Sequence, residues 1–138
     1  MLYNPTISCF NNKGLLNNNS YNSKPIIIKK EVYAMIEQIY RMSTGDEKVV
    51  ERVIQDENIH YLHMVFNKGE GLPEHFSNSN VYMTVVRGAL SIGLNDQSVH
   101  QYDKGTLLKI PVNTKMNVKN LSENVLELIV VKAPAPLK

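Results

Sequence analysis

The chain has few cysteines, no long apolar run and little net charge, and each of these excludes a class of protein. Its 138 residues include a single cysteine, Cys9, so no disulfide can form within the chain and a secreted disulfide scaffold is excluded. No apolar run approaches the ~18 residues that a membrane-spanning helix requires. The formal net charge is only +2, which gives no electrostatic footprint for nucleic acid. We therefore expect no nucleic-acid partner and no membrane partner.

The first residues also lack the basic start and apolar core of a secretory signal peptide, so we expect a cytoplasmic protein. Residues 1–24 are rich in asparagine and have few apolar side chains. This composition predicts an irregular N-terminal arm, which is either a passive tail or a segment that contacts a partner. Residues 25–138 are predicted to form one domain, because their number fits a single hydrophobic core.

From residue 47 onward the pattern predicts short strands separated by turns. The expected strands are residues 49–54, 59–66, 81–94, 106–110, 114–118 and 125–132. Turn-forming residues stand between them, as at 95–98 and 103–105. No helical pattern alternates with these strands, which favours an all-β sandwich or barrel. The segment 31–42 suits a helical face and one side of a strand equally well, and its period does not decide between them.

The expected strand 59–66 is apolar or aromatic on both faces. A strand that is buried on both faces needs a second layer outside the barrel, from another sheet or another subunit. We therefore expect a homodimer.

Two segments carry glycine-anchored spacings. In the first, gaps of five, one, three and six residues separate Gly69, His75, Ser77, Val81 and Gly88. In the second, gaps of five, one, two and three residues separate Gly105, Pro111, Asn113, Met116 and Asn120. Gly88 and Gly105 are expected at tight turns with positive φ, where a residue without a side chain is favoured.

These spacings resemble the two motifs of the cupin superfamily, in the form typical of small single-domain bacterial cupins. The family motifs read G-x5-H-x-H-x3-E-x6-G and G-x5-P-x-G-x2-H-x3-N. The resemblance covers about residues 47–132, and it implies a double-stranded β-helix, which is a small jelly-roll barrel. In metal-binding members, the two histidines and the glutamate of the first motif and the histidine of the second hold one divalent ion.

Only one of these four implied ligands is present. His75 keeps the first position, whereas the other three are taken by Ser77, Val81 and Met116. A transition metal needs three or four nitrogen, oxygen or thiolate ligands, and one imidazole cannot supply them. We therefore predict a degenerate metal site and no cofactor.

The alternative is a divalent metal held by a rebuilt site that includes a histidine of the expected strand 59–66. His60 and His63 differ by an odd number, so they face opposite sides of that strand and one of them could join His75. The competing interpretation is a hydrogen-bonded histidine in the sheet or in a dimer interface, and it is favoured.

Strand alternation predicts the lining of a concave, mostly apolar cavity inside the barrel. The predicted lining is His75, Ser77, Val81, Met83, Val85, Met116 and Val118, with Asn80 near the mouth. The competing interpretation is that these side chains simply fill a small barrel as core. No aspartate or glutamate falls on an inward position, so the lining offers no carboxylic acid as a partner for His75. The remaining candidate acid is Tyr61, and the sequence does not determine which face of its strand it occupies.

Three functions follow, and the first is our prediction. The barrel binds a small, partly apolar molecule without metal. Alternatively, it is an enzyme, either of isomerase or epimerase type with His75 as general base, or a metal-dependent oxygenase if His60 or His63 rebuilds a site. The third option is a structural or dimerisation module with a filled barrel. The sequence leaves the catalytic residues and the ligand unassigned.

Overall fold

The computed structural model describes residues 35–137 of a chain that divides into two units, residues 1–37 and 38–138. The predicted arm, residues 1–24, and the predicted start of the domain at Pro25 lie outside the described residues. Within the ambiguous segment 31–42, residues 35–42 form neither helix nor strand. No helix in the described part of the chain is long and apolar enough to cross a membrane.

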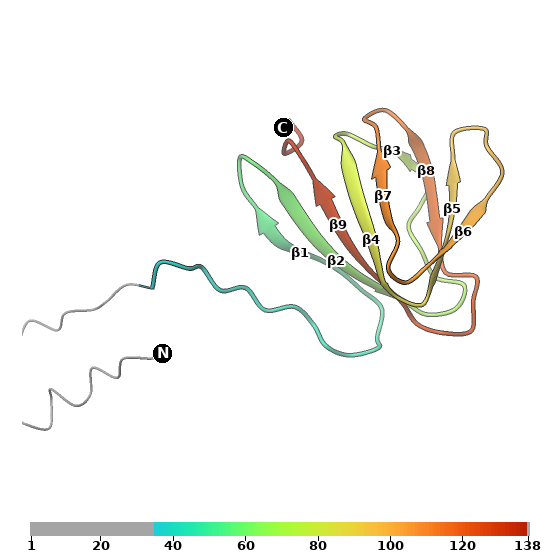
Figure 1. Ribbon diagram of the computed structural model, residues 1–138, viewed down its shortest axis with the longest axis horizontal. Helices are drawn as coiled ribbons and strands as arrows, with labels where there is room; N and C mark the ends of the chain where they lie inside the picture. The colour runs from blue at the N-terminus through green and yellow to red at the C-terminus, as the bar shows by residue number, and fades with distance from the viewer. Residues whose placement is uncertain (1–34, 138) are drawn as a thin grey trace, which may run out of the picture. The chain divides into compact units, whose positions relative to one another are not determined.

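The described part of the second unit is built from nine strands (Figure 1). Their bounds are β1 Val49–Gln55, β2 His60–Phe66, β3 His75–Phe76, β4 Val81–Arg87, β5 Ala89–Leu94, β6 His100–Asp103, β7 Leu107–Ile110, β8 Lys115–Lys119 and β9 Leu126–Lys132. The expected all-β class is therefore confirmed.

The strands form two antiparallel sheets that face each other. One sheet has the order β1-β2-β9-β4-β7, and the other has the order β3-β8-β5-β6. The last strand, β9, lies between β2 and β4, so the chain closes the first sheet only at its end. The chain passes from β4 in the five-stranded sheet to β5 and β6 in the four-stranded sheet and returns to the first sheet with β7, so it winds around a common interior.

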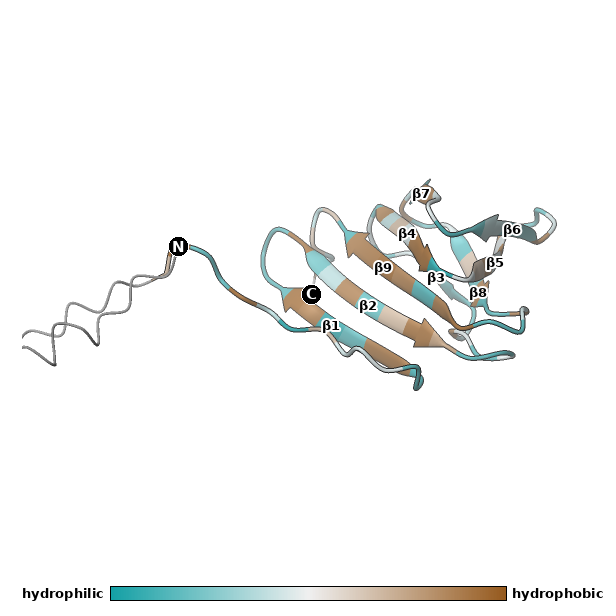
Figure 2. Cartoon of the chain, turned by 60° about the horizontal axis from the view of Figure 1, so that its bottom comes forward, coloured by the Kyte–Doolittle hydropathy of each residue, from teal (hydrophilic) through white to brown (hydrophobic). Residues whose placement is uncertain are grey.

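The hydrophobic core lies between the sheets and follows the predicted alternation. Along β4, Val81, Met83 and Val85 are buried, while Val86 is 46% exposed. Met116 and Val118 face the same core from β8 in the other sheet. In Figure 2, β9 is brown over most of its length, because apolar residues occupy both of its faces.

The expected long strand 81–94 is wrong, because the chain breaks at Gly88 into β4 and β5, which belong to different sheets. Gly88 has φ of 79°. A Cβ atom at this position would lie 2.2 Å from the carbonyl oxygen of Val125. Glycine is thus required both by the backbone conformation and by the close approach of the neighbouring chain, as the expected tight turn demands.

The second motif serves the fold through two asparagines. Asn113 stands where the family motif has glycine, and it adopts φ of 64°, a conformation that asparagine tolerates better than most side chains. Asn120 is fully buried. Its Nδ2 donates to the carbonyl oxygens of Phe66 and Asn124 at 2.9 and 2.8 Å, which ties the end of β2 to the β8–β9 loop.

Candidate functional site

A cavity of about 260 Å³ lies between the two sheets. Its walls come from both sheets and from the loop before β3, and they are Val50, Leu62, Met64, Leu72, Pro73, His75, Val81, Met83, Met116, Val118, Val130 and Lys132. Ten of these twelve side chains are apolar, and the exceptions are His75 and Lys132. Val50 and Pro73 are exposed, so the cavity reaches the surface on their side.

The structure brings five of the seven residues that we predicted as lining to this cavity. They are His75, Val81, Met83, Met116 and Val118. Val85 lies deeper in the core and does not line it. Ser77 is buried beside the loop before β8, where its hydroxyl donates to the carbonyl oxygen of Pro111 at 2.8 Å and accepts from the Thr114 N–H at 3.0 Å. Its side chain therefore serves the turn.

His75 is held in one orientation by the chain that leads into β3. Its Nδ1 lies 2.8 Å from the carbonyl oxygen of Pro73. A carbonyl oxygen can only accept, so Nδ1 carries the proton and Nε2 is the atom that can accept one in the neutral ring. In the β3–β8 pair, Met116 lies directly opposite His75. The first ligand position of the first family motif and the ligand position of the second motif are thus cross-strand neighbours here.

The residues at the four family ligand positions do not fit a divalent ion. The Ser77 hydroxyl is committed to the backbone, Val81 offers no donor, and the thioether of Met116 suits mainly soft Cu(I). One imidazole, that of His75, is left. Among residues 35–137, no group of three or more histidine, cysteine, aspartate or glutamate side chains is arranged to hold a metal.

Neither histidine of β2 joins His75 at the cavity. His60 begins the strand and does not line the cavity, although it shares the inward face of β2 with Leu62 and Met64. His63 lies on the opposite face, as the alternation requires, and only 1% of it is exposed. It is a hydrogen-bonded histidine within the sheet.

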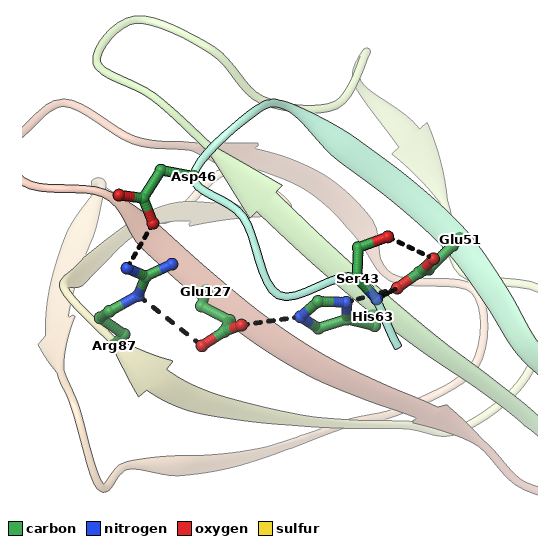
Figure 3. Close-up of polar contacts among 6 residues, drawn as sticks. All are labelled: Ser43, Asp46, Glu51, His63, Arg87 and Glu127. Carbon is green, nitrogen blue, oxygen red and sulfur yellow. Dashed lines mark hydrogen bonds and ion pairs between the residues drawn. The ribbon is translucent and has the colours of Figure 1, made fainter. Parts of the chain in front are cut away.

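Both ring nitrogens of His63 contact a carboxylate, as Figure 3 shows. Nδ1 lies 2.7 Å from Glu51 of β1, and Nε2 lies 2.8 Å from Glu127 of β9. Two carboxylates need two donors, so the ring is protonated in this arrangement. Burial lowers the pKa of His63, but the hydrogen bonds to Glu127 and Glu51 outweigh it and the pKa is raised. The hydrogen bond from His63 lowers the pKa of Glu51.

The same group of charges fastens residues 43–46 to the outer face of the five-stranded sheet. At one end, the backbone N–H and the hydroxyl of Ser43 donate to Glu51 at 2.7 and 2.9 Å. At the other end, Asp46 accepts from Arg87 Nη1 at 2.7 Å, and Arg87 Nε lies 3.7 Å from Glu127 (Figure 3). We call residues 43–46 the strap. The His63 cluster is therefore structural, because its groups bind one another and the strap.

Lys132 is the charged cavity residue that sequence reasoning missed. It follows Leu128 and Val130 at two-residue intervals on β9, so alternation places all three on the inward face. Its Nζ donates to Asn78 Oδ1 at 3.0 Å. Burial, and to a smaller extent the positive charge of Arg52, lower the pKa of Lys132. Applying the alternation rule to the last strand would have found it.

The remaining missed residues lie on β1, β2 and β9 and in the loop before β3. They are Val50, Leu62, Met64, Leu72, Pro73 and Val130 of β9. Their place in the cavity depends on β2 and β9 being neighbours in one sheet. That pairing joins segments more than fifty residues apart and leaves no local signal in the sequence.

Comparison with known proteins shows which proteins resemble this sequence and share this architecture. No family model matches the chain. An uncharacterised protein of Methanocaldococcus jannaschii is 38% identical over 105 residues, which are 75% of this chain and 90% of that protein. Its crystal structure, described as an RmlC-like cupin family protein with a double-stranded β-helix fold, superposes with a TM-score of 0.72 and covers 74% of this chain and 94% of that one.

More distant structures share the fold alone. A cupin superfamily protein of Desulfitobacterium hafniense is 12% identical, with a TM-score of 0.58 over 67% of this chain and 83% of its own. A cupin-like protein of Thermotoga maritima is 19% identical, with a TM-score of 0.58 over 62% of this chain and 67% of its own. The sequence identity to the Methanocaldococcus protein over most of both chains is what decides the family. This chain belongs to the RmlC-like cupin family and folds as a double-stranded β-helix.

Proposed function

We propose that the barrel binds a small, partly apolar molecule without the help of a metal ion. The observation that carries the proposal is the cavity of about 260 Å³, whose wall is apolar except for His75 and Lys132. Apolar walls with a few polar groups are the usual composition of a small-molecule site. The cavity lies slightly below the roughly 300 Å³ at which sites for drug-sized ligands begin, so the ligand is a small one.

The size of the cavity argues against a simply filled barrel. Protein interiors are close-packed, and voids larger than a water molecule are few. A water molecule takes up about 30 Å³ in the liquid, so this cavity has room for several. Met64, Met83 and Met116 in the wall are unbranched and flexible, which lets the cavity adjust to its occupant.

A catalytic role is the second candidate, and one observation favours it. The wall holds His75, a base, and Lys132, an ammonium that can act as an acid, whereas the sequence placed no aspartate or glutamate on an inward position. This pair suits an isomerase or epimerase type of reaction better than a metal-dependent oxygenase, because the donor set does not fit a divalent ion. Binding ranks first, because it needs only the cavity and its wall.

The test places a bulky side chain at the open side of the cavity, where it would block the entry of a ligand. Val50 lines the cavity and Val86 lies on the outward face of β4, and both are 46% exposed, so Val86→Trp is a matched control for Val50→Trp. We expect at least one compound of a small-metabolite library to raise the thermal unfolding midpoint of the native protein and of V86W, but not of V50W. If no compound distinguishes V50W from V86W, the cavity is not a binding site and the proposal fails.

A further inference from the structure

The wall of the cavity carries positive charge and no negative charge. Of the twelve lining residues, none is aspartate or glutamate, and Lys132 is the one lysine or arginine among them. Lys132 and Val81 are paired across β9 and β4, and Val81 is a fully buried wall residue. The ammonium group is therefore attached at the edge of an apolar surface, where charges are screened less than in open water.

Lys132 lacks an anionic partner among the described residues. Its hydrogen bond goes to the neutral amide oxygen of Asn78. The ion pairs of the described residues use the cations of His63, Lys68 and Arg87, and none of them includes Lys132. The carboxylate of Asp56, in the β1–β2 turn, accepts the backbone N–H groups of Asn58 and Ile59 at 2.8 and 2.9 Å.

A second cation stands on the same face. Arg52 of β1 is paired with Leu62, a wall residue, so alternation directs it to the cavity side of the sheet. Arg52 also has no ion pair among the described residues. Its charge is close enough to lower the pKa of Lys132. Two like charges that approach each other without an anion repel, and a bound anion would relieve that repulsion.

We propose that the ligand of this cavity is an organic carboxylate, with its apolar body between the sheets and its carboxylate on Lys132 Nζ beside Arg52. The inference rests on the proposed binding function and adds the chemical class of the ligand. A carboxylate suits this site because it is a compact anion that leaves most of the cavity for an apolar body. Lysine and arginine make charge-assisted hydrogen bonds to carboxylates, which are stronger than bonds between neutral groups.

The test compares two probes with the same alkyl chain, the anion hexanoate and the neutral hexanamide, by isothermal titration calorimetry on the full chain. We expect the native protein to bind hexanoate about ten- to a hundred-fold more tightly than hexanamide, as the loss of one charged hydrogen bond implies. Lys132→Gln removes that preference, Lys132→Arg restores it, and Arg52→Gln reduces it. Lys104→Gln, on an exposed lysine of the β6–β7 turn, leaves it unchanged.

The outcomes separate this inference from the function on which it rests. If both probes bind equally and V50W abolishes both, the cavity binds small molecules but the carboxylate class is wrong. If hexanoate binding survives K132Q undiminished while K132Q keeps the native unfolding midpoint, the assignment to Lys132 is wrong. If neither probe binds the native protein, the carboxylate class is overturned, and the metabolite library decides the binding function separately.

Discussion

At the scale of single residues, the His63 ring is the clearest case of a side chain whose charge supports the fold. It lies almost fully buried between Glu51 and Glu127, and each ring nitrogen has a carboxylate within 2.8 Å. The protonated ring satisfies both carboxylates, and Glu51 in turn holds Ser43 of the strap. Loss of the proton would leave one carboxylate facing a ring nitrogen that no longer donates.

This arrangement predicts how stability depends on pH. The pKa of His63 is raised above its ordinary 6.5, so its contribution is fully present below pH 6.5 and is lost as pH rises through the raised value. The pKa of Glu51 is lowered below its ordinary 4.5, so its contribution is present above pH 4.5 and is lost as pH falls through the lowered value. The cluster therefore contributes most between pH 4.5 and 6.5.

We expect His63→Gln to lower the free energy of unfolding by about 1.5–3 kcal/mol in this window, the range for a hydrogen bond to a charged group. The difference from the native protein should shrink as pH rises, because the native protein then loses its own imidazolium. Urea unfolding at several pH values measures this. The control is His100→Gln, at an exposed position on β6, whose free energy of unfolding should depend on pH as that of the native protein does. Parallel pH profiles for native protein and H63Q would contradict the account.

Sequence reasoning reached part of this residue-scale picture. Alternation along β2 correctly put His60 and His63 on opposite faces. The partners of His63 could not be predicted, because Glu51 is 12 residues away and Glu127 is 64 residues away. Ser77 was predicted to line the cavity because it takes a ligand position of the family motif, yet its hydroxyl is used by the turn at Pro111 and Thr114.

At the scale of strands, glycine decides where the chain changes sheets. Residues 81–94 are rich in β-forming side chains and predict one strand, but Gly88 divides them. The motif spacing placed a tight turn at Gly88, but not the change of sheet, which brings a carbonyl oxygen of the β8–β9 loop against this residue. Most other strands lie within one or two residues of their predicted bounds, because turn-forming residues mark their ends.

The break predicts a strong position-specific effect. Gly88→Ala should lower the free energy of unfolding by more than about 2 kcal/mol, because a positive φ costs an L-residue about 1–2 kcal/mol and the new Cβ would also overlap the Val125 carbonyl oxygen. Gly93→Ala on β5 is the control. Its Cβ would meet nothing nearer than 3.6 Å, so its effect should stay within about 1 kcal/mol.

Urea unfolding of the two glycine variants under the same conditions makes the comparison. The account expects a clearly lower midpoint for G88A than for G93A, with an unchanged slope. Equal midpoints would mean that the β4–β5 turn tolerates a side chain, and that the change of sheets does not depend on Gly88.

At the scale of the whole molecule, the motif spacing predicted the double-stranded β-helix, and the structure and its relatives agree. The homodimer and the cytoplasmic location stay predictions. The argument for the dimer was that β2 is apolar on both faces, but His63 and Val65 on its outer face are already buried within one chain. The sheet order, which assembles the cavity, could not be predicted because β9 pairs with strands distant in sequence.

The central claim is that this cupin cavity works without a metal ion, and the metal content of the protein tests it most directly. Elemental analysis of protein purified without chelator should be run beside His75→Ala, which removes the one imidazole that keeps a family ligand position. The account predicts the same background level of divalent metal in both proteins. Near-stoichiometric metal in the native protein that is lost in H75A would contradict it, because the His75 ring would then be a ligand.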